Sequence, residues 1–130
     1  MILPISTTGN RVFLCISLFL LSSTLSAQRI QSFTFTTGIE KLYPIDNRKI
    51  FQVGERAWAW IKVVDYPPGD TLLVEWYGGE TLLYTQRLRI PYRSMRTYCY
   101  KNLRRPGIYS VIVRTPEDQV LLADSFLVKE

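Results

Sequence analysis

Hydrophobic and polar residues alternate with a period of two along most of the chain after residue 31, which is typical of β-strands that bury one face. In the stretch 72–77, for example, Leu72, Val74 and Trp76 share one face. No helical periodicity interrupts this pattern after residue 27. The alternation predicts seven strands, at residues 32–37, 55–64, 72–77, 81–90, 96–101, 108–115 and 120–128.

Turn residues separate these stretches. Proline presets φ and glycine accepts positive φ, so residues 66–70 (YPPGD), Gly78-Gly79 and Pro106-Gly107 predict turns. Residues 38–54 read as one long connection. Short strands with turns about every 8–12 residues are the pattern of an Ig-like antiparallel β-sandwich. The predicted fold class is therefore all-β, with a small β-barrel as the alternative.

The alternation also predicts the core. Trp58 and Trp60 share one face of their strand, and Ala59 and Ile61 share the other. We expect one tryptophan in the sandwich core and the other partly exposed, where it can stack on a sugar ring or anchor a protein contact. Tyr109, Val111, Val113, Phe126 and Val128 are predicted to point inward. Shared faces are also predicted for Phe33 and Phe35, for Leu72, Val74 and Trp76, and for Leu82, Tyr84, Leu88 and Ile90.

The first 27 residues have the three-part layout of a secretory signal peptide. Arg11 is followed by the apolar run 12–21 and by the small residues 22–27, which end in Ala27. A membrane-spanning helix needs about 20 apolar residues, more than this run supplies, but an uncleaved N-terminal anchor remains the alternative. The sequence predicts a signal peptide at 1–27 and one domain at 28–130, exported to the periplasm or surface of a bacterium and without a membrane span once mature.

The chain has no histidine, and Cys99 is the one cysteine after residue 27. An intramolecular disulfide is therefore excluded from the mature domain, and Ser-His-Asp and Cys-His catalytic arrangements are excluded too. A zinc site would have to use Cys99 and carboxylates alone, so we predict no metal and no cofactor. Cys99 itself is expected to be a small buried residue, with a redox or intermolecular thiol as the alternative.

Charge is segregated along the chain. Residues 28–130 contain 15 basic and 11 acidic residues, a net charge of +4, yet residues 81–116 contain eight basic residues and no acidic one. Tyrosines are interleaved with these bases, and arginine forks bind carboxylates and phosphates in a bidentate manner. Arg87 and Arg89 lie two apart on a strand and should project from the same face. The predicted binding residues are Arg87, Arg89, Arg93, Arg96, Tyr98, Tyr100, Lys101, Arg104 and Arg105.

Other interpretations of the charged residues remain open. Charges on edge strands protect a sheet from aggregation, so the basic stretch can serve that purpose alone. Single-stranded nucleic acid also suits basic residues among aromatics, but the predicted export argues against it. Glu75 and Glu80 flank the Gly-Gly turn and could act as an acid–base pair on a glycosidic bond, although we expect both to be solvated strand-end charges.

Four stretches in order along the chain resemble the bacterial envelope module known as domain-of-unknown-function family 2914. They are residues 35–44 (FTTGIEKLYP), 76–79 (WYGG), 96–101 (RTYCYK) and a closing hairpin from 106 to 128. The resemblance implies a compact exported β-sandwich and brings no catalytic residue. The chain departs from the family where Tyr98-Cys99 replaces Trp-Ser and where Val74 occupies a position that we expect to hold histidine.

Together these observations predict a monomeric, non-catalytic interaction module that is not an enzyme. Its Arg/Tyr-rich surface would bind an anionic envelope component, namely a polysaccharide, lipopolysaccharide or an acidic protein surface. The alternative is a structural accessory subunit that docks on an envelope assembly by apolar contacts. A carboxylate-based, glycan-active enzyme is the third candidate.

Overall fold

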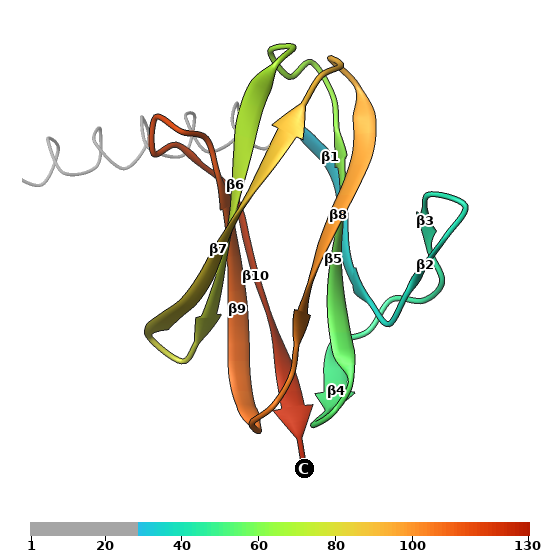
Figure 1. Ribbon diagram of the computed structural model, residues 1–130, viewed down its shortest axis with the longest axis vertical. Helices are drawn as coiled ribbons and strands as arrows, with labels where there is room; N and C mark the ends of the chain where they lie inside the picture. The colour runs from blue at the N-terminus through green and yellow to red at the C-terminus, as the bar shows by residue number, and fades with distance from the viewer. Residues whose placement is uncertain (1–28) are drawn as a thin grey trace, which may run out of the picture.

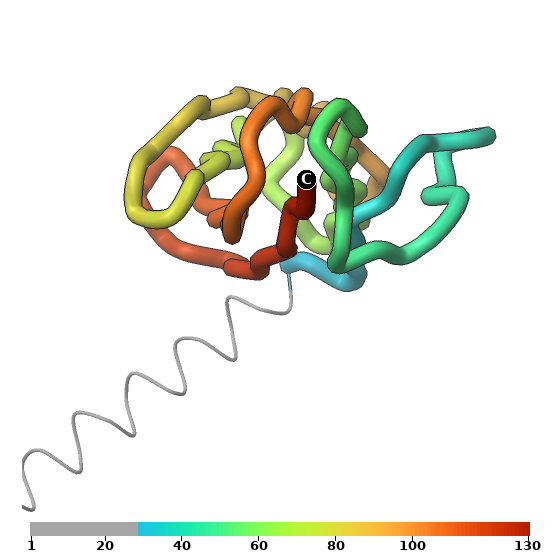
Figure 2. Tube along the Cα trace, turned by 90° about the horizontal axis from the view of Figure 1, so that it is seen from below, coloured from blue at the N-terminus to red at the C-terminus, as the bar shows by residue number. Residues whose placement is uncertain are grey.

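Two β-sheets stack face to face, and a small hairpin projects from their side (Figures 1 and 2). The computed structural model describes residues 29–130, so the predicted signal peptide lies outside the described residues. One sheet has the order β1-β5-β8 and the other the order β4-β10-β9-β6-β7, while β2 pairs only with β3. The strands are β1 (Ile30–Thr36), β2 (Ile39–Glu40), β3 (Tyr43–Pro44), β4 (Ile50–Gln52), β5 (Arg56–Val63), β6 (Asp70–Gly78), β7 (Thr81–Ile90), β8 (Met95–Asn102), β9 (Gly107–Arg114) and β10 (Val120–Lys129).

The predicted all-β sandwich is confirmed, and all seven predicted strands are present with small shifts at their ends. The strands divide between two separate sheets, which favours the sandwich over the barrel. Their pairing is antiparallel throughout except for β4, which runs parallel to β10. Within residues 29–130, no helix is long and apolar enough to cross a membrane.

The predicted long connection at residues 38–54 was wrong in detail, because it contains β2, β3 and β4. The β2–β3 turn holds Lys41 and Leu42 at φ 52° and 69°, a left-handed conformation that sequence patterns associate with glycine or asparagine. The turn therefore carries no recognisable signal. β4 is three residues long and exists because Phe51 is fully buried while its backbone pairs with β10.

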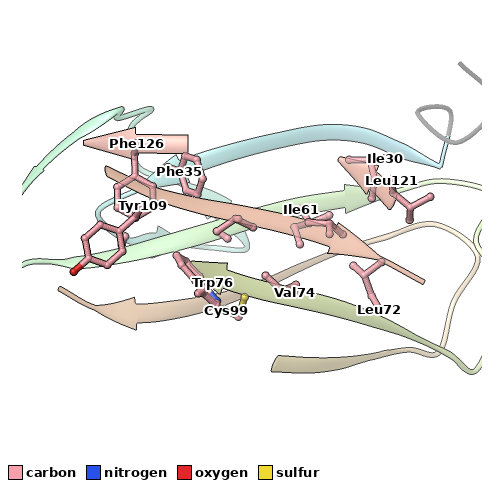
Figure 3. Packing of buried hydrophobic residues seen from close by; sticks show 14 of the residues in the cluster. Ile30, Phe35, Ile61, Leu72, Val74, Trp76, Cys99, Tyr109, Leu121 and Phe126 are labelled. Carbon is pink, nitrogen blue, oxygen red and sulfur yellow. The ribbon is translucent and has the colours of Figure 1, made fainter. Parts of the chain in front are cut away.

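The core lies between the two sheets (Figure 3). Its aromatic centre is Phe126, whose ring centroid is 4.7 Å from that of Phe35, 5.1 Å from Phe51, 5.5 Å from Tyr109 and 6.4 Å from Trp76. The predicted shared face of β6 and the predicted inward residues of β9 are buried. Period-two alternation therefore identified this side of the sandwich correctly.

The expectation that one tryptophan of β5 occupies the core was wrong. Inward positions of β5 are held by smaller side chains, including Ala57, Ala59 and Ile61, all fully buried. Trp58 and Trp60 point outward. Trp60 is nevertheless buried, because the β2–β3 hairpin covers it and its indole Nε1–H donates to the Leu42 carbonyl at 2.9 Å.

Tyr109 anchors the loop between β8 and β9. Its hydroxyl donates to the carbonyl of Arg105 at 2.8 Å, four residues upstream. This matches the tyrosine corner that Ig-like sandwiches place near the start of the corresponding strand. The bond fixes the backbone that carries Arg104 and Arg105, two of the predicted binding residues.

Candidate binding surface on the three-stranded sheet

The outer face of the three-stranded sheet carries an ordered array of aromatic and basic side chains. Residues that are directly opposite on antiparallel strands share a face. From one end of the β5–β8 pair to the other, the outward-facing pairs are Arg56 with Asn102, Trp58 with Tyr100, Trp60 with Tyr98, and Lys62 with Arg96. Two aromatic pairs therefore lie between two pairs that contain cations. We call these eight residues, together with Tyr43 of β3, the aromatic face.

This sheet contains no carboxylate. The strand sequences IQSFTFT, RAWAWIKV and MRTYCYKN include four basic residues and neither aspartate nor glutamate. The four cations are therefore not neutralised from within their own sheet, and the potential over this face favours anions.

The rings of the aromatic face pack against one another, and the two tyrosines of β8 stay accessible although the hairpin covers Trp60. The Trp58 ring lies 4.8 Å from Tyr100 and 5.8 Å from Tyr98, in tilted and edge-to-face arrangements. Tyr43 stacks beside Trp60 at 6.2 Å. Tyr98 and Tyr100 are 37% and 41% exposed, so each can offer its ring and its hydroxyl to a ligand.

Two arginines lie over these rings. The guanidinium carbon of Arg56 is 4.1 Å from the Tyr100 ring centroid, and its Nε–H donates to Asn102 Oδ1 at 3.0 Å. The Arg96 guanidinium lies 4.4 Å from the Tyr43 ring centroid. Cation–π stacking restrains each guanidinium, so less conformational freedom is lost when it binds an anion. Among the described residues, neither arginine forms an ion pair.

A groove adjoins the aromatic face where the edges of β7 and β8 separate. Its volume is about 420 Å³, and Tyr100 belongs both to the groove and to the aromatic face. Arg105 lines a neighbouring depression of about 200 Å³ together with Lys101 and Arg104. The groove residues are Leu83, Tyr84, Gln86, Tyr100, Lys101, Asn102 and Arg104.

The structure therefore brings six of the nine predicted binding residues onto one continuous surface. Arg96, Tyr98 and Tyr100 lie on the aromatic face. The three others, Lys101, Arg104 and Arg105, line the adjoining groove and its neighbouring depression.

The other three predicted residues lie elsewhere. Arg87 and Arg89 project from β7 on the outer face of the five-stranded sheet, opposite Leu73 and Thr71. Both sheets of the sandwich separate them from the aromatic face. Arg93 lies in the connection between β7 and β8, where its carbonyl accepts a hydrogen bond from the Tyr66 amide at 2.9 Å.

Four members of the aromatic face escaped the sequence prediction: Arg56, Lys62, Asn102 and Tyr43. The first two share the parity of Trp58 and Trp60 on one carboxylate-free strand, which was a usable signal. Their alignment with the tyrosines of β8 depends on strand pairing across about 40 residues of sequence. The contribution of Tyr43 depends on the hairpin, whose turn has no sequence signal.

The two glutamates considered as an acid–base pair have different surroundings. Glu75 Oε1 lies 2.8 Å from Arg114 Nη2 and accepts a hydrogen bond from the Tyr77 hydroxyl at 3.2 Å. Glu80 is exposed in the turn between β6 and β7. The expectation that both glutamates are solvated strand-end charges therefore holds for Glu80 and is wrong for Glu75, which is largely buried in an ion pair with Arg114.

Cys99 is buried among core residues, as predicted, and is 2% exposed. Burial raises the pKa of its thiol to about 12, although the Trp76 side chain acts in the opposite direction. In residues 29–130, no group of three or more His, Cys, Asp or Glu side chains is placed to hold a metal ion.

No family model matches the chain, and no curated protein matches it. The resemblance to domain-of-unknown-function family 2914 therefore stays a prediction. Among solved structures, the chain is similar to a β-glucosidase from Listeria innocua in complex with glucose, with 13% identity over 76% of this chain and a TM-score of 0.45. It spans only 16% of that enzyme's length.

A second similar structure is the CARDB domain of the PF1109 protein from Pyrococcus furiosus, in complex with di-metal ions. Identity is 14%, coverage is 75% of this chain and 86% of that domain, and the TM-score is 0.44. Likenesses this distant carry no information about a ligand or a reaction.

Proposed function

We propose that the protein is a non-catalytic, exported interaction module of a bacterial envelope, and that it binds an anionic partner through the aromatic face and the adjoining groove. The observation that carries this proposal is the arrangement of cations and exposed rings on a sheet without a carboxylate. Such a surface attracts anions from a distance and offers both charge and ring contacts on arrival.

Neutralisation within the chain does not account for these cations. The ion pairs among residues 29–130 use Arg48, Lys49 and Arg114. None of the seven basic residues predicted to bind takes part in them. The acidic residues elsewhere in the chain therefore leave the predicted cations available to an external anion.

Protection of a sheet edge accounts for only some of the cations. It suits Arg87 and Arg89 on β7, and Arg96 and Lys101 on β8, because these are outermost strands of their sheets. Arg56 and Lys62 lie on β5, which is paired on both sides, by β1 and by β8. A central strand has no edge to protect, so its outward cations need another explanation.

The test compares two double variants with the same change in charge on opposite faces of the sandwich. The purified protein is bound to envelope extract at low salt and eluted with a salt gradient, and the eluted anionic component is purified for affinity measurements. Arg56→Gln with Arg96→Gln should weaken its binding at least tenfold, because each charged hydrogen-bonded contact contributes about 1.5–3 kcal/mol. Arg87→Gln with Arg89→Gln is the matched control and should retain binding. Equal effects of the two double variants would contradict the proposal.

A second candidate function is supported by exposed aliphatic residues on the opposite face. Ile50, Leu127 and Ile108 are aligned across β4, β10 and β9, and they are 49%, 36% and 63% exposed. We call these three residues the aliphatic row.

The aliphatic row would suit a structural subunit that docks on a larger envelope assembly by apolar contacts. In that case association would resist salt. Ile108→Lys with Leu127→Lys would abolish it, whereas Arg56→Gln with Arg96→Gln would leave it unchanged. The reverse pattern supports the anionic partner instead.

A further inference from the structure

The aromatic face has cations at both ends and rings between them. Arg56 and Lys62 are six residues apart on β5, which at about 3.4 Å per residue separates the two cationic ends by about 20 Å. Trp58, Tyr98 and Tyr100 line the interval with partly exposed rings, while Trp60 lies beneath the β2–β3 hairpin. A small anion can contact only one end of this array.

We infer that the aromatic face binds a single chain of an acidic polysaccharide that lies along β5 and β8 and contacts both cationic ends. This inference rests on the proposed function and specifies its ligand class. A polymer that occupies both ends gains from the high effective concentration of its second charged group once the first is bound.

The cationic ends are suited to carboxylates. Arg56 already donates its Nε–H to Asn102, which leaves its two Nη groups for an external acceptor. Those two groups form a fork that matches the two oxygens of one carboxylate. At the other end, Lys62 and Arg96 lie opposite each other and provide a second anion contact.

The middle of the array favours sugars over an acidic peptide. Pyranose rings present C–H groups that pack on aromatic surfaces and hydroxyls that bond with tyrosine, and Tyr98 and Tyr100 expose both their rings and their hydroxyls. An extended peptide generally binds a sheet by adding backbone hydrogen bonds at an edge. The backbone of β5 is already paired with β1 and β8, so its outer surface offers side chains only.

Calorimetry with galacturonic acid oligomers tests the inference. The hexamer should bind at least tenfold more tightly than the dimer, because only the hexamer is long enough to contact both ends. Its methyl-esterified form, which lacks the charges, should bind weakly. Arg56→Gln or Arg96→Gln alone should reduce the affinity for the hexamer to about that for the dimer, while Arg87→Gln with Arg89→Gln should not.

A polyglutamate peptide of the same charge tests whether the aromatic face prefers an acidic polysaccharide to an acidic peptide. It should bind more weakly than the galacturonate hexamer. Tyr98→Leu should lower the affinity for the hexamer severalfold and leave the affinity for the peptide unchanged. A melting curve confirms that the variant is folded. Equal affinity for peptide and hexamer, or equal affinity for hexamer and dimer, would overturn the inference.

Failure of the inference can be told apart from failure of the proposed function. If an envelope component binds in a salt-sensitive manner that depends on Arg56 and Arg96, but no acidic oligosaccharide binds, the ligand class is wrong and the proposed function stands. If no anionic partner depends on these arginines, both are wrong.

Discussion

The surroundings of each arginine, more than the number of arginines, distinguish the two outer faces. Arg56 is stacked on Tyr100 and hydrogen-bonded to Asn102, whereas Arg87 extends from an edge strand opposite Leu73. An arginine restrained on a ring loses less freedom on binding than one that extends into solvent. The sequence shows both simply as members of one basic stretch, so it could not rank them.

Cys99 gives a prediction at the scale of one residue. With a pKa of about 12, its thiol is almost fully protonated near neutral pH, and it is also nearly inaccessible. Since the thiolate is the reactive form, the folded protein should react with a maleimide or with a disulfide reagent at pH 8 far more slowly than a free thiol. Mass spectrometry of labelled protein measures this directly.

The control for Cys99 is the unfolded chain, which should label completely in concentrated guanidinium chloride. Rapid labelling of the folded protein under native conditions would show that the thiol is accessible. That result would revive the interpretation of Cys99 as a redox or intermolecular thiol.

Inward-facing residues were predictable because two signals, the apolar side chain and its parity along the strand, agree at each position. Val74 and Val111, for example, are apolar and have the right parity, and both are fully buried. Outward residues lack this redundancy, because their neighbours come from strands that are distant in sequence. Trp60 illustrates the failure: its size suggested the core, but the hairpin that covers it could not be read from the sequence.

At the scale of elements, the β2–β3 hairpin is tied to the end of β1 by Asp46. Its carboxylate accepts hydrogen bonds from the Thr36 hydroxyl at 2.6 Å, the Thr37 amide at 2.8 Å and the Thr37 hydroxyl at 2.6 Å. Burial alone would raise the pKa of Asp46, but these hydrogen bonds outweigh it and lower the pKa below the ordinary 3.8. The clamp thereby places the hairpin, and with it Tyr43, over Trp60.

Asp46→Asn should destabilise the protein by about 1–2 kcal/mol at pH 7, since an amide cannot accept all three bonds. Because folding lowers the pKa of Asp46, its contribution is complete above about pH 4 and is lost as the pH falls through the folded-state value. The difference in unfolding free energy between wild type and variant should therefore narrow in acid. Denaturant titrations at pH 7 and at pH 2.5 measure it.

Asp65→Asn is a suitable comparison for Asp46→Asn, because Asp65 is exposed and asparagine accepts its positive φ of 52°. This change should alter stability by less than about 0.5 kcal/mol at either pH. A pH-independent loss in Asp46→Asn would instead show that the carboxylate charge is unimportant to the clamp.

At the scale of the whole molecule, the two outer faces differ in the sign of their charges. The three-stranded sheet carries four cations and no carboxylate, whereas the five-stranded sheet carries charges of both signs, among them the ion pair of Arg114 with Glu75, together with the aliphatic row. Concentrating like charges on one small sheet costs stability. Lys62 and Arg96 are direct cross-strand neighbours of the same sign, an arrangement that destabilises antiparallel sheets.

Lys62→Glu tests whether the destabilising pair of Lys62 and Arg96 is kept because it contributes to ligand binding. The substitution replaces a repulsive pair with an attractive one, so the free energy of unfolding should rise by about 0.5 kcal/mol in denaturant titrations. If the aromatic face binds an anion, the same variant should bind that ligand at least tenfold more weakly. Arg89→Glu changes the net charge equally on the other face and should leave the affinity almost unchanged. Opposite effects of Lys62→Glu on stability and affinity are expected of a binding surface, whereas higher stability with unchanged affinity would mean that Lys62 is not part of it.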